Sequence, residues 1–121
     1  MRVLLVDDEP PCLDELVYLL SKQENIEIIG AFTSPVKALK ASADLKPEIA
    51  FLDLSMPHMS GPELARELLV RSPDLKIVFI TAYRKELEKI RDSPAVESIL
   101  KPVNDAKLQD LFRRLSVFLD I

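Results

Sequence analysis

Four short apolar runs in this chain each end at a polar residue suited to binding phosphate or a metal ion. The runs and the residues that end them are 3–6 before Asp7 and Asp8, 49–52 before Asp53, 77–80 before Thr81, and 99–100 before Lys101. Uninterrupted apolar runs of this length are typical of parallel strands that are buried on both faces. The carboxyl ends of such strands meet at one edge of a sheet, where ligands bind. The pattern therefore predicts one shared site.

Segments with helical periodicity separate the apolar runs. After the first run, apolar residues recur at helical spacing at Leu13, Leu16, Val17 and Leu20. Another apolar stretch at 26–30 predicts a further strand, and Ser34 before Pro35 is typical of a helix start, as is Ser60. We predict an α/β fold, a doubly wound, five-stranded parallel sheet between helix layers. The 121 residues fit one domain spanning residues 1–121.

Charge and composition exclude several classes of function. With 16 basic and 20 acidic residues, the chain carries a formal net charge of -4 and lacks a positive field for nucleic acid. The single cysteine, Cys12, cannot form a disulfide within the chain, which suits a reducing compartment. No stretch approaches the roughly 20 apolar residues of a membrane span. We therefore expect a cytoplasmic protein that binds neither membranes nor, through this segment, nucleic acid.

Three acids meet at the predicted edge of the sheet. Asp7, Asp8 and Asp53 would repel one another unless a cation or a proton compensates their charge. Oxygen ligands favour Mg²⁺, and Mn²⁺ is expected to substitute for it. A carboxylate can also accept a phosphoryl group when the phosphoryl oxygens are neutralised. The isolated acid Asp53 is the predicted acceptor, and Mg²⁺, Lys101 and the Thr81 hydroxyl would stabilise the transferring group.

A plainer interpretation applies to each of these residues alone. Strand ends often carry Asp, Thr or Lys because the chain turns toward water there. For Thr81 or Lys101 by itself, that interpretation is preferred. The complete set, with each member at the end of a separate apolar run, favours a functional site.

The sequence around these positions resembles the response regulator receiver domain, the phosphoacceptor module of bacterial two-component signalling. The matching motifs are LVDDEP at 5–10, LDLSMP at 52–57 with Gly61, ITA at 80–82 and KP at 101–102. The resemblance covers essentially the whole chain and implies the strand order 2-1-3-4-5. It also implies a switch, in which a sensor histidine kinase or phosphotransfer protein phosphorylates Asp53. The phosphorylated conformer would control an effector or partner, most simply in transcription.

The resemblance also implies a set of metal ligands. Asp8 and Asp53 would bind Mg²⁺ directly, and Asp7 would act through a water molecule. The backbone carbonyl of Ser55 would complete the protein ligands. Such a domain is a regulatory module rather than an enzyme, because it catalyses only its own phosphotransfer and dephosphorylation.

The resemblance also implies contacts to the phosphoryl group on Asp53. Thr81 and Lys101 would contact the phosphoryl oxygens. The resemblance further implies a cis peptide bond between Lys101 and Pro102, since cis bonds are essentially confined to X-Pro.

One position departs from the family pattern. Three residues before Lys101, receiver domains usually carry Tyr or Phe, which turns inward when the conserved hydroxyl moves onto the phosphoryl group. This chain has Ser98 there, and a serine cannot fill the same space. The usual aromatic switch is therefore in doubt, and Tyr83 is a candidate to replace it or to gate access to Asp53.

The output face implied by the resemblance consists of the fourth helix, the last strand and the fifth helix. A homodimer through this face is one expected assembly. The fourth helix, within residues 84–92, is strongly charged, so a merely solvated helix is the alternative interpretation. Pro94 is predicted to end that helix. We expect no effector domain within the chain, which leaves an excised module and a stand-alone relay both open.

Two other functions compete with this hypothesis. An aspartate-nucleophile phosphatase would pair Asp7 with Glu9, but Pro11 stands where such enzymes usually carry Thr or Val, and the chain has no room for a substrate cap. A receiver-like binding module that signals without phosphate is favoured by Ser98 and opposed by the intact acids. A dinucleotide site is excluded because the chain has two glycines and no glycine-rich loop.

Overall fold

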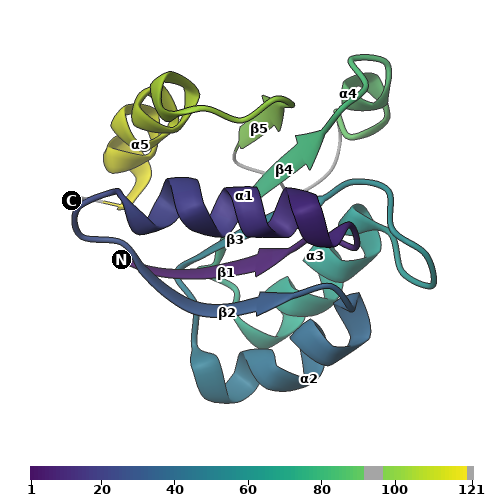
Figure 1. The fold of residues 1–121 in the computed structure, drawn as a ribbon. Helices are drawn as coiled ribbons and strands as arrows, with labels where there is room; N and C mark the ends of the chain where they lie inside the picture. The colour runs from purple at the N-terminus through teal and green to yellow at the C-terminus, as the bar shows by residue number, and fades with distance from the viewer. Residues whose placement is uncertain (92–96, 120–121) are drawn as a thin grey trace.

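The computed structural model describes residues 1–91 and 97–119 and contains alternating strands and helices (Figure 1). In chain order the elements are β1 (Arg2–Val6), α1 (Pro10–Ser21), β2 (Glu27–Phe32), α2 (Pro35–Leu45), β3 (Ile49–Asp53), α3 (Gly61–Arg71), β4 (Lys76–Thr81), α4 (Glu86–Lys89), β5 (Glu97–Leu100) and α5 (Asp105–Leu119). All neighbouring strands pair in parallel in the order β2-β1-β3-β4-β5. The predicted fold class and strand order are confirmed. No helix in the described part of the chain has the length and apolar character needed to cross a membrane.

The central strands β1, β3 and β4 are buried on both faces, as their apolar runs predicted. Helices α1 and α5 cover one face, here called the α1/α5 side, and α2 and α3 cover the other, the α2/α3 side (Figure 1). Strand residues on the α1/α5 side are Val3, Leu5, Ile49, Phe51, Val78 and Ile80. Those on the α2/α3 side are Leu4, Val6, Ala50, Leu52, Ile77 and Phe79. Successive side chains alternate between faces, so the residue that ends each strand has a fixed side.

Serine side chains begin two of the helices at the predicted positions. The Ser34 hydroxyl accepts a hydrogen bond from the backbone N–H of Lys37 at 3.2 Å. The Ser60 hydroxyl accepts one from the backbone N–H of Glu63 at 3.3 Å. Each bond satisfies an N–H group that has no partner within its helix. These starts fix where the loops after β2 and β3 end.

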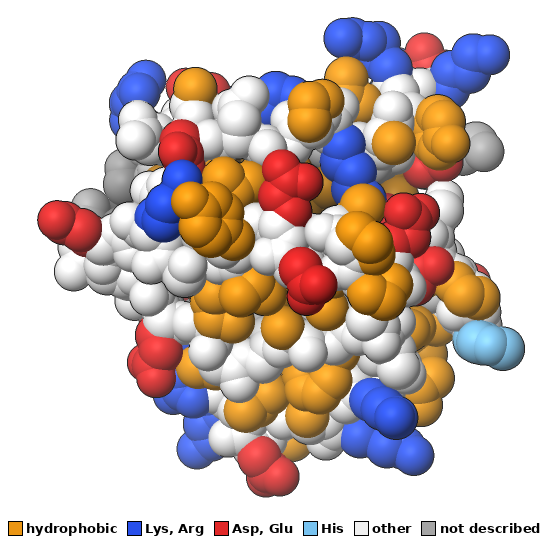
Figure 2. Space-filling model, in the orientation of Figure 1, with side chains coloured by type: hydrophobic (Ala, Val, Ile, Leu, Met, Phe, Trp, Pro, Cys, Tyr) orange, Lys and Arg blue, Asp and Glu red, His pale blue; other side chains and the backbone are white. Residues whose placement is uncertain are grey.

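The fourth helix is much shorter than the sequence predicted. It spans Glu86–Lys89, whereas the charged segment 84–92 suggested a longer helix. The segment has few apolar side chains to anchor it, with Leu87 partly buried and Ile90 buried on the α2/α3 side. Lys and Arg side chains gather over this corner, at the upper right of Figure 2. The predicted effect of Pro94 lies outside the described residues.

Candidate functional site

Asp7, Asp8 and Asp53 meet at the carboxyl ends of β1 and β3. The two strands pair in parallel with Val6 beside Leu52. The next residue of each chain segment, Asp7 after Val6 and Asp53 after Leu52, therefore lies at the same edge of the sheet. The three side chains each offer a carboxylate oxygen, and these oxygens lie within 4.8 Å of one another. Asp7 is 2% exposed and Asp53 8% exposed. The sequence-predicted acids therefore form one cluster at this edge of the sheet, in which Asp7 and Asp53 are buried and Asp8 is half-buried.

Lys101 reaches the same cluster from the end of β5. Its Nζ atom lies 3.1 Å from Oδ2 of Asp7, while the backbone N–H of Glu9 donates to Oδ1 of Asp7 at 3.0 Å. The backbone N–H of Lys101 also donates to the carbonyl of Thr81 at 2.7 Å, which continues the pairing of β4 with β5. The Lys101-Pro102 peptide bond is cis, as predicted. The positively charged ammonium group of Lys101 thus lies beside the acids at this edge of the sheet.

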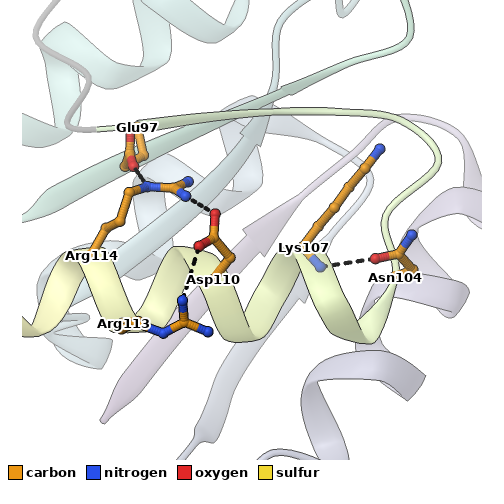
Figure 3. Close-up of polar contacts among 6 residues, drawn as sticks. All are labelled: Glu97, Asn104, Lys107, Asp110, Arg113 and Arg114. Atoms are coloured by element: carbon orange, nitrogen blue, oxygen red, sulfur yellow. Dashed lines mark hydrogen bonds and ion pairs between the residues drawn. The ribbon is translucent and has the colours of Figure 1, made fainter.

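Lys107, in the first turns of α5, tethers the chain on both sides of Lys101. Its ammonium group donates to the carbonyl of Leu100 at 2.7 Å and to that of Pro102 at 2.9 Å. The Asn104 side chain accepts from the backbone N–H of Lys107 at 2.8 Å (Figure 3). These contacts fix the turn from which Lys101 projects. Lys107 was not predicted from the sequence, because nothing in its local pattern separates it from an ordinary exposed lysine.

The electrostatic environment of Asp53 favours its protonated form when no cation is bound. Burial is the largest of the effects that together raise the pKa of Asp53 to about 7; the charge of Asp7 and the hydrogen bond and charge of Asp8 also raise it, and the charge of Lys101 lowers it. Burial lowers the pKa of Lys101, but its bond to Asp7 and the charges of Asp53 and Asp7 outweigh burial and raise it. The site therefore holds one ammonium group among an excess of carboxylates.

The donor set fits a hard divalent cation. Among the described residues, Oδ1 of Asp8 is buried without a hydrogen-bond partner, although carboxylate oxygens rarely remain so. Three carboxylates with oxygens this close are the ligand type that Mg²⁺ prefers. A bound cation would satisfy the Asp8 oxygen and offset the repulsion that raises the pKa of Asp53.

Thr81 approaches the site from the other side of the sheet. It follows Ile77 and Phe79 in the strand alternation and is 1% exposed. Its hydroxyl donates to Oε2 of Glu86 at 2.8 Å, and the backbone N–H of Tyr83 donates to the Thr81 oxygen at 3.1 Å. The side chain of Tyr83 is 67% exposed, so only its backbone contacts Thr81 directly.

Glu86 is a second residue at the site that was not predicted from the sequence. Its carboxylate accepts from the hydroxyls of both Thr81 and Ser55, the latter at 3.2 Å to each oxygen. In the sequence Glu86 is one acid within a charged segment, and no pattern marks it. Only the path of the chain between β4 and α4 brings it to the site.

Gly61, the first residue of α3, allows that helix to pack directly under the end of β3. Its N–H donates to the carbonyl of Leu54 at 2.8 Å. A Cβ atom at Gly61 would lie 2.5 Å from the Asp53 carbonyl oxygen and 3.0 Å from Cα of Leu54. Both obstacles are backbone atoms, so a side chain at this position would displace Asp53 itself.

We therefore expect Gly61→Ala to lower the free energy of unfolding by about 1–3 kcal/mol, the usual cost of overpacking. Gly30→Ala is the matched control, because its Cβ would meet the Phe32 ring at 2.7 Å, and a side chain can move aside. Urea unfolding of the two variants measures the difference. Equal losses would contradict a backbone clash at Gly61.

A cavity of about 340 Å³ opens beside the acids on the α1/α5 side. Its lining includes Asp7 and Lys101 from the site and Cys12, Glu15 and Leu16 from α1. Burial is the largest of the effects that raise the pKa of the Cys12 thiol, which keeps that thiol neutral and weakly nucleophilic. The cavity gives access to the site from the surface of α1.

Comparison with known proteins agrees with this geometry. A family model described as the response regulator receiver domain matches residues 3–113. The transcriptional regulatory protein BtsR of Salmonella typhi is 37% identical over 117 residues, which cover 95% of this chain and 48% of that protein. An uncharacterized response regulatory protein of Shewanella oneidensis is 39% identical over 114 residues, covering 93% of this chain and 47% of that protein. The chain spans about half the length of these curated relatives.

Solved structures match over nearly the whole chain. The response regulatory domain of protein mrkE from Klebsiella pneumoniae superposes with a TM-score of 0.86 at 28% identity, covering 99% of this chain and 98% of that one. The REC domain of AraT from Geobacillus stearothermophilus, at 23% identity and a TM-score of 0.84, shares the fold, with 98% of this chain and 95% of that chain covered. With a family model that matches most of its length, the chain belongs to the response regulator receiver domain family of two-component signalling.

Proposed function

We propose that residues 1–121 form a single receiver domain that is switched by phosphorylation of Asp53. The phosphodonor would be a sensor histidine kinase or a phosphotransfer protein, and the reaction would require Mg²⁺, for which Mn²⁺ can substitute. The observation that carries the proposal is the cluster of Asp7, Asp8 and Asp53, two of them buried, with Lys101 beside it. Repulsion and desolvation of these carboxylates destabilise the folded state, and a purely structural role gives no reason to place them together.

In this proposal the cation is held by Asp8 and Asp53 directly, by Asp7 through water and by the Ser55 backbone carbonyl. When bound, Mg²⁺ supplies positive charge to the phosphoryl oxygens and holds the acceptor in its ionised form. The carboxylate oxygens of Asp7, Asp8 and Asp53, which lie within 4.8 Å of one another, support a shared cation site, whereas the roles of the Ser55 carbonyl and of the water molecule rest on the family resemblance.

The transfer step uses the side chains already at the site. An Asp53 carboxylate oxygen attacks the phosphorus of a phosphohistidine, the P–N bond breaks, and its electron pair leaves with the imidazole, which then takes a proton. The Lys101 ammonium group stabilises negative charge on the phosphoryl oxygens, and the Thr81 hydroxyl would donate to another of them. Hydrolysis of the acyl phosphate by water resets Asp53. The domain thus regulates rather than turns over an external substrate.

The output that we propose is control of transcription, because relatives of the chain are named transcriptional regulatory proteins. The phosphoryl group must bind the active conformer preferentially, since only a difference in interaction energy shifts a population. The output surface would be the face formed by α4, β5 and α5, through which a homodimer could form. In this structure Arg114 pairs within the chain with Glu97 and with Asp110, and Asp110 also pairs with Arg113 (Figure 3). Exchange of these pairs between two chains would give such a dimer its specificity.

A second candidate function is a binding module that works without phosphate. Ser98 stands where an aromatic switch residue is usual, and in this structure the Thr81 hydroxyl is bonded to Glu86. The intact acid cluster favours the phosphorylated switch.

Incubation with Mg²⁺ and acetyl phosphate, followed by intact-protein mass measurement, distinguishes the two functions. We expect wild type to gain one labile phosphoryl group and Asp53→Asn to gain none. Asp74→Asn is the matched control, because Asp74 is an exposed acid just before β4, at the opposite edge of the sheet, and its variant should be phosphorylated normally. An adduct that persists in Asp53→Asn would contradict the assigned acceptor. No adduct in wild type, even with a competent histidine kinase, would favour the binding module.

A further inference from the structure

The hydroxyl of Thr81 is already committed in this structure. Its nearest acceptor is Oε2 of Glu86 at 2.8 Å, the Tyr83 carbonyl is a more distant acceptor at 3.5 Å, and the side chain is buried. A threonine hydroxyl has a single proton to donate. A bond from Thr81 to a phosphoryl oxygen on Asp53 therefore excludes the bond to Glu86, and the two states of the hydroxyl are alternatives.

We propose that Glu86 is a positioning residue that holds Thr81 in the inactive arrangement, and that phosphorylation acts by displacing the Glu86 carboxylate. This inference rests on the proposed phosphorylation of Asp53. The Glu86–Thr81 bond links the phosphorylation site to α4 directly, because Glu86 is the first residue of that helix. The chain thereby has a route for the signal that does not need an aromatic side chain at position 98.

A second contact makes Glu86 sensitive to the loop that follows Asp53. The Ser55 hydroxyl donates to both oxygens of the Glu86 carboxylate at 3.2 Å, and Ser55 lies two residues after Asp53. Glu86 thus joins the β3–α3 loop to the start of α4. Hydrogen bonds to a carboxylate are stronger than bonds between neutral groups, so this arrangement holds the unphosphorylated state in place.

The structure also provides space for the displaced carboxylate. A cavity of about 190 Å³ lies beside Glu86 and is lined on its other sides by Ser55, Ser60, Pro62 and Ile90, among others. Ile90 anchors the segment after α4 in the core of the α2/α3 side. Displacement of Glu86 can therefore turn the first residues of α4 about this anchor without unfolding the core.

The test compares the binding of Mg²⁺ alone with the binding of beryllofluoride, an analogue of the phosphoryl group, in the presence of saturating Mg²⁺. Isothermal titration of the whole chain gives both affinities. In Glu86→Ala the competing acceptor is lost, so we expect beryllofluoride to bind about tenfold more tightly, the usual scale for one charge-assisted hydrogen bond. The affinity for Mg²⁺ alone is the reference for each variant, so the tenfold gain is expected in beryllofluoride binding at saturating Mg²⁺ and does not depend on whether loss of the Ser55 contact alters the metal site.

Glu88→Ala is the matched control, since it removes the same charge from an exposed position on the same helix. If Glu88→Ala tightens beryllofluoride binding as much as Glu86→Ala does, general repulsion explains the effect and the inference fails. Glu86→Gln keeps the size of the side chain and a weaker acceptor, so it should give an intermediate gain and serves if the alanine variant does not fold. Beryllofluoride binding that is unchanged or weaker in both Glu86 variants overturns the role of Glu86 but leaves the proposed phosphorylation of Asp53 in place. If wild type binds no beryllofluoride and is not phosphorylated, the proposed function fails first, and this inference fails with it.

Discussion

Metal-free Asp53→Asn is expected to be more stable than wild type at pH 8 and about equally stable near pH 4. The folded domain raises the pKa of Asp53 from 3.8 to about 7, chiefly because the carboxyl is buried and lies near Asp7. The folded state therefore binds the proton more tightly than the unfolded state does. At a pH below about 4 the carboxyl is protonated in both states, and its burial does not reduce the stability of the fold. The free energy of unfolding falls as the pH rises from about 4 to about 7 and no longer changes above that range. Asparagine removes the charge and hence this loss.

The expected difference is large for a single substitution. Because solvent reaches part of the carboxyl and screens its charge, the upward pKa shift of Asp53 corresponds to a difference on the order of 2 kcal/mol at pH 8. Urea unfolding in the presence of a chelator, at pH 4 and at pH 8, measures it. Asp74→Asn, at an exposed acid, should match wild type at both values of pH. If the difference in the free energy of unfolding between wild type and Asp53→Asn is the same at pH 4 and at pH 8, the buried-charge explanation is wrong.

Addition of Mg²⁺ to the same samples provides an internal check. A ligand that binds only the folded state stabilises it by about 2.7 kcal/mol at a concentration of 100 times Kd. Wild type at pH 8 should recover much of the lost stability, because the cation offsets the charge repulsion among Asp7, Asp8 and Asp53. Asp53→Asn should gain less, since it lacks one of the proposed ligands.

Lys101→Met is expected to lower the free energy of unfolding by about 3 kcal/mol at pH 7.5. Asp7 is only 2% exposed, and loss of its partner at 3.1 Å leaves a buried carboxylate without a compensating charge. Breaking a buried ion pair on one side generally costs about 3–5 kcal/mol. The lower end applies here because Asp7 keeps its hydrogen bond from the backbone of Glu9.

The matched comparison is Lys22→Met, which breaks an ion pair to Asp105 at the same distance of 3.1 Å. Those partners are 41% and 49% exposed, so the loss should stay below about 1 kcal/mol. Combining Lys101→Met with Asp7→Asn should restore most of the stability, because the neutral side chain no longer needs a cation. Urea unfolding of wild type and of these three variants tests this. If Lys101→Met costs no more than Lys22→Met, Asp7 is solvated well enough not to need Lys101.

The sheet and its acid cluster were predictable because they depend on local pattern. An apolar run such as 77–80 can be satisfied only by burial, and parallel strands bring their ends to one edge whatever the loops do. Asp7, Asp8 and Asp53 were therefore expected to meet, and their oxygens do. The Lys101-Pro102 bond, expected from family resemblance, is cis as predicted.

Glu86 and Lys107 were not predictable in the same way. Each makes its contacts through a long charged side chain. A sequence pattern does not determine which partner such a flexible side chain reaches. The short α4 was missed for a related reason. Its segment carries charges that are compatible with a helix but little apolar surface to hold one, so tertiary contacts at Leu87 and Ile90 decide its length.

The alternation of strand residues has a consequence for how partners share this domain. Asp53 follows Ile49 and Phe51 toward α1 and α5, whereas Thr81 follows Ile77 and Phe79 toward the opposite layer. In the proposed switch, a phosphodonor protein would enter over α1, and the hydroxyl that responds would pull on α4. Phosphotransfer to Asp53 and the response at α4 would then take place on opposite sides of the sheet.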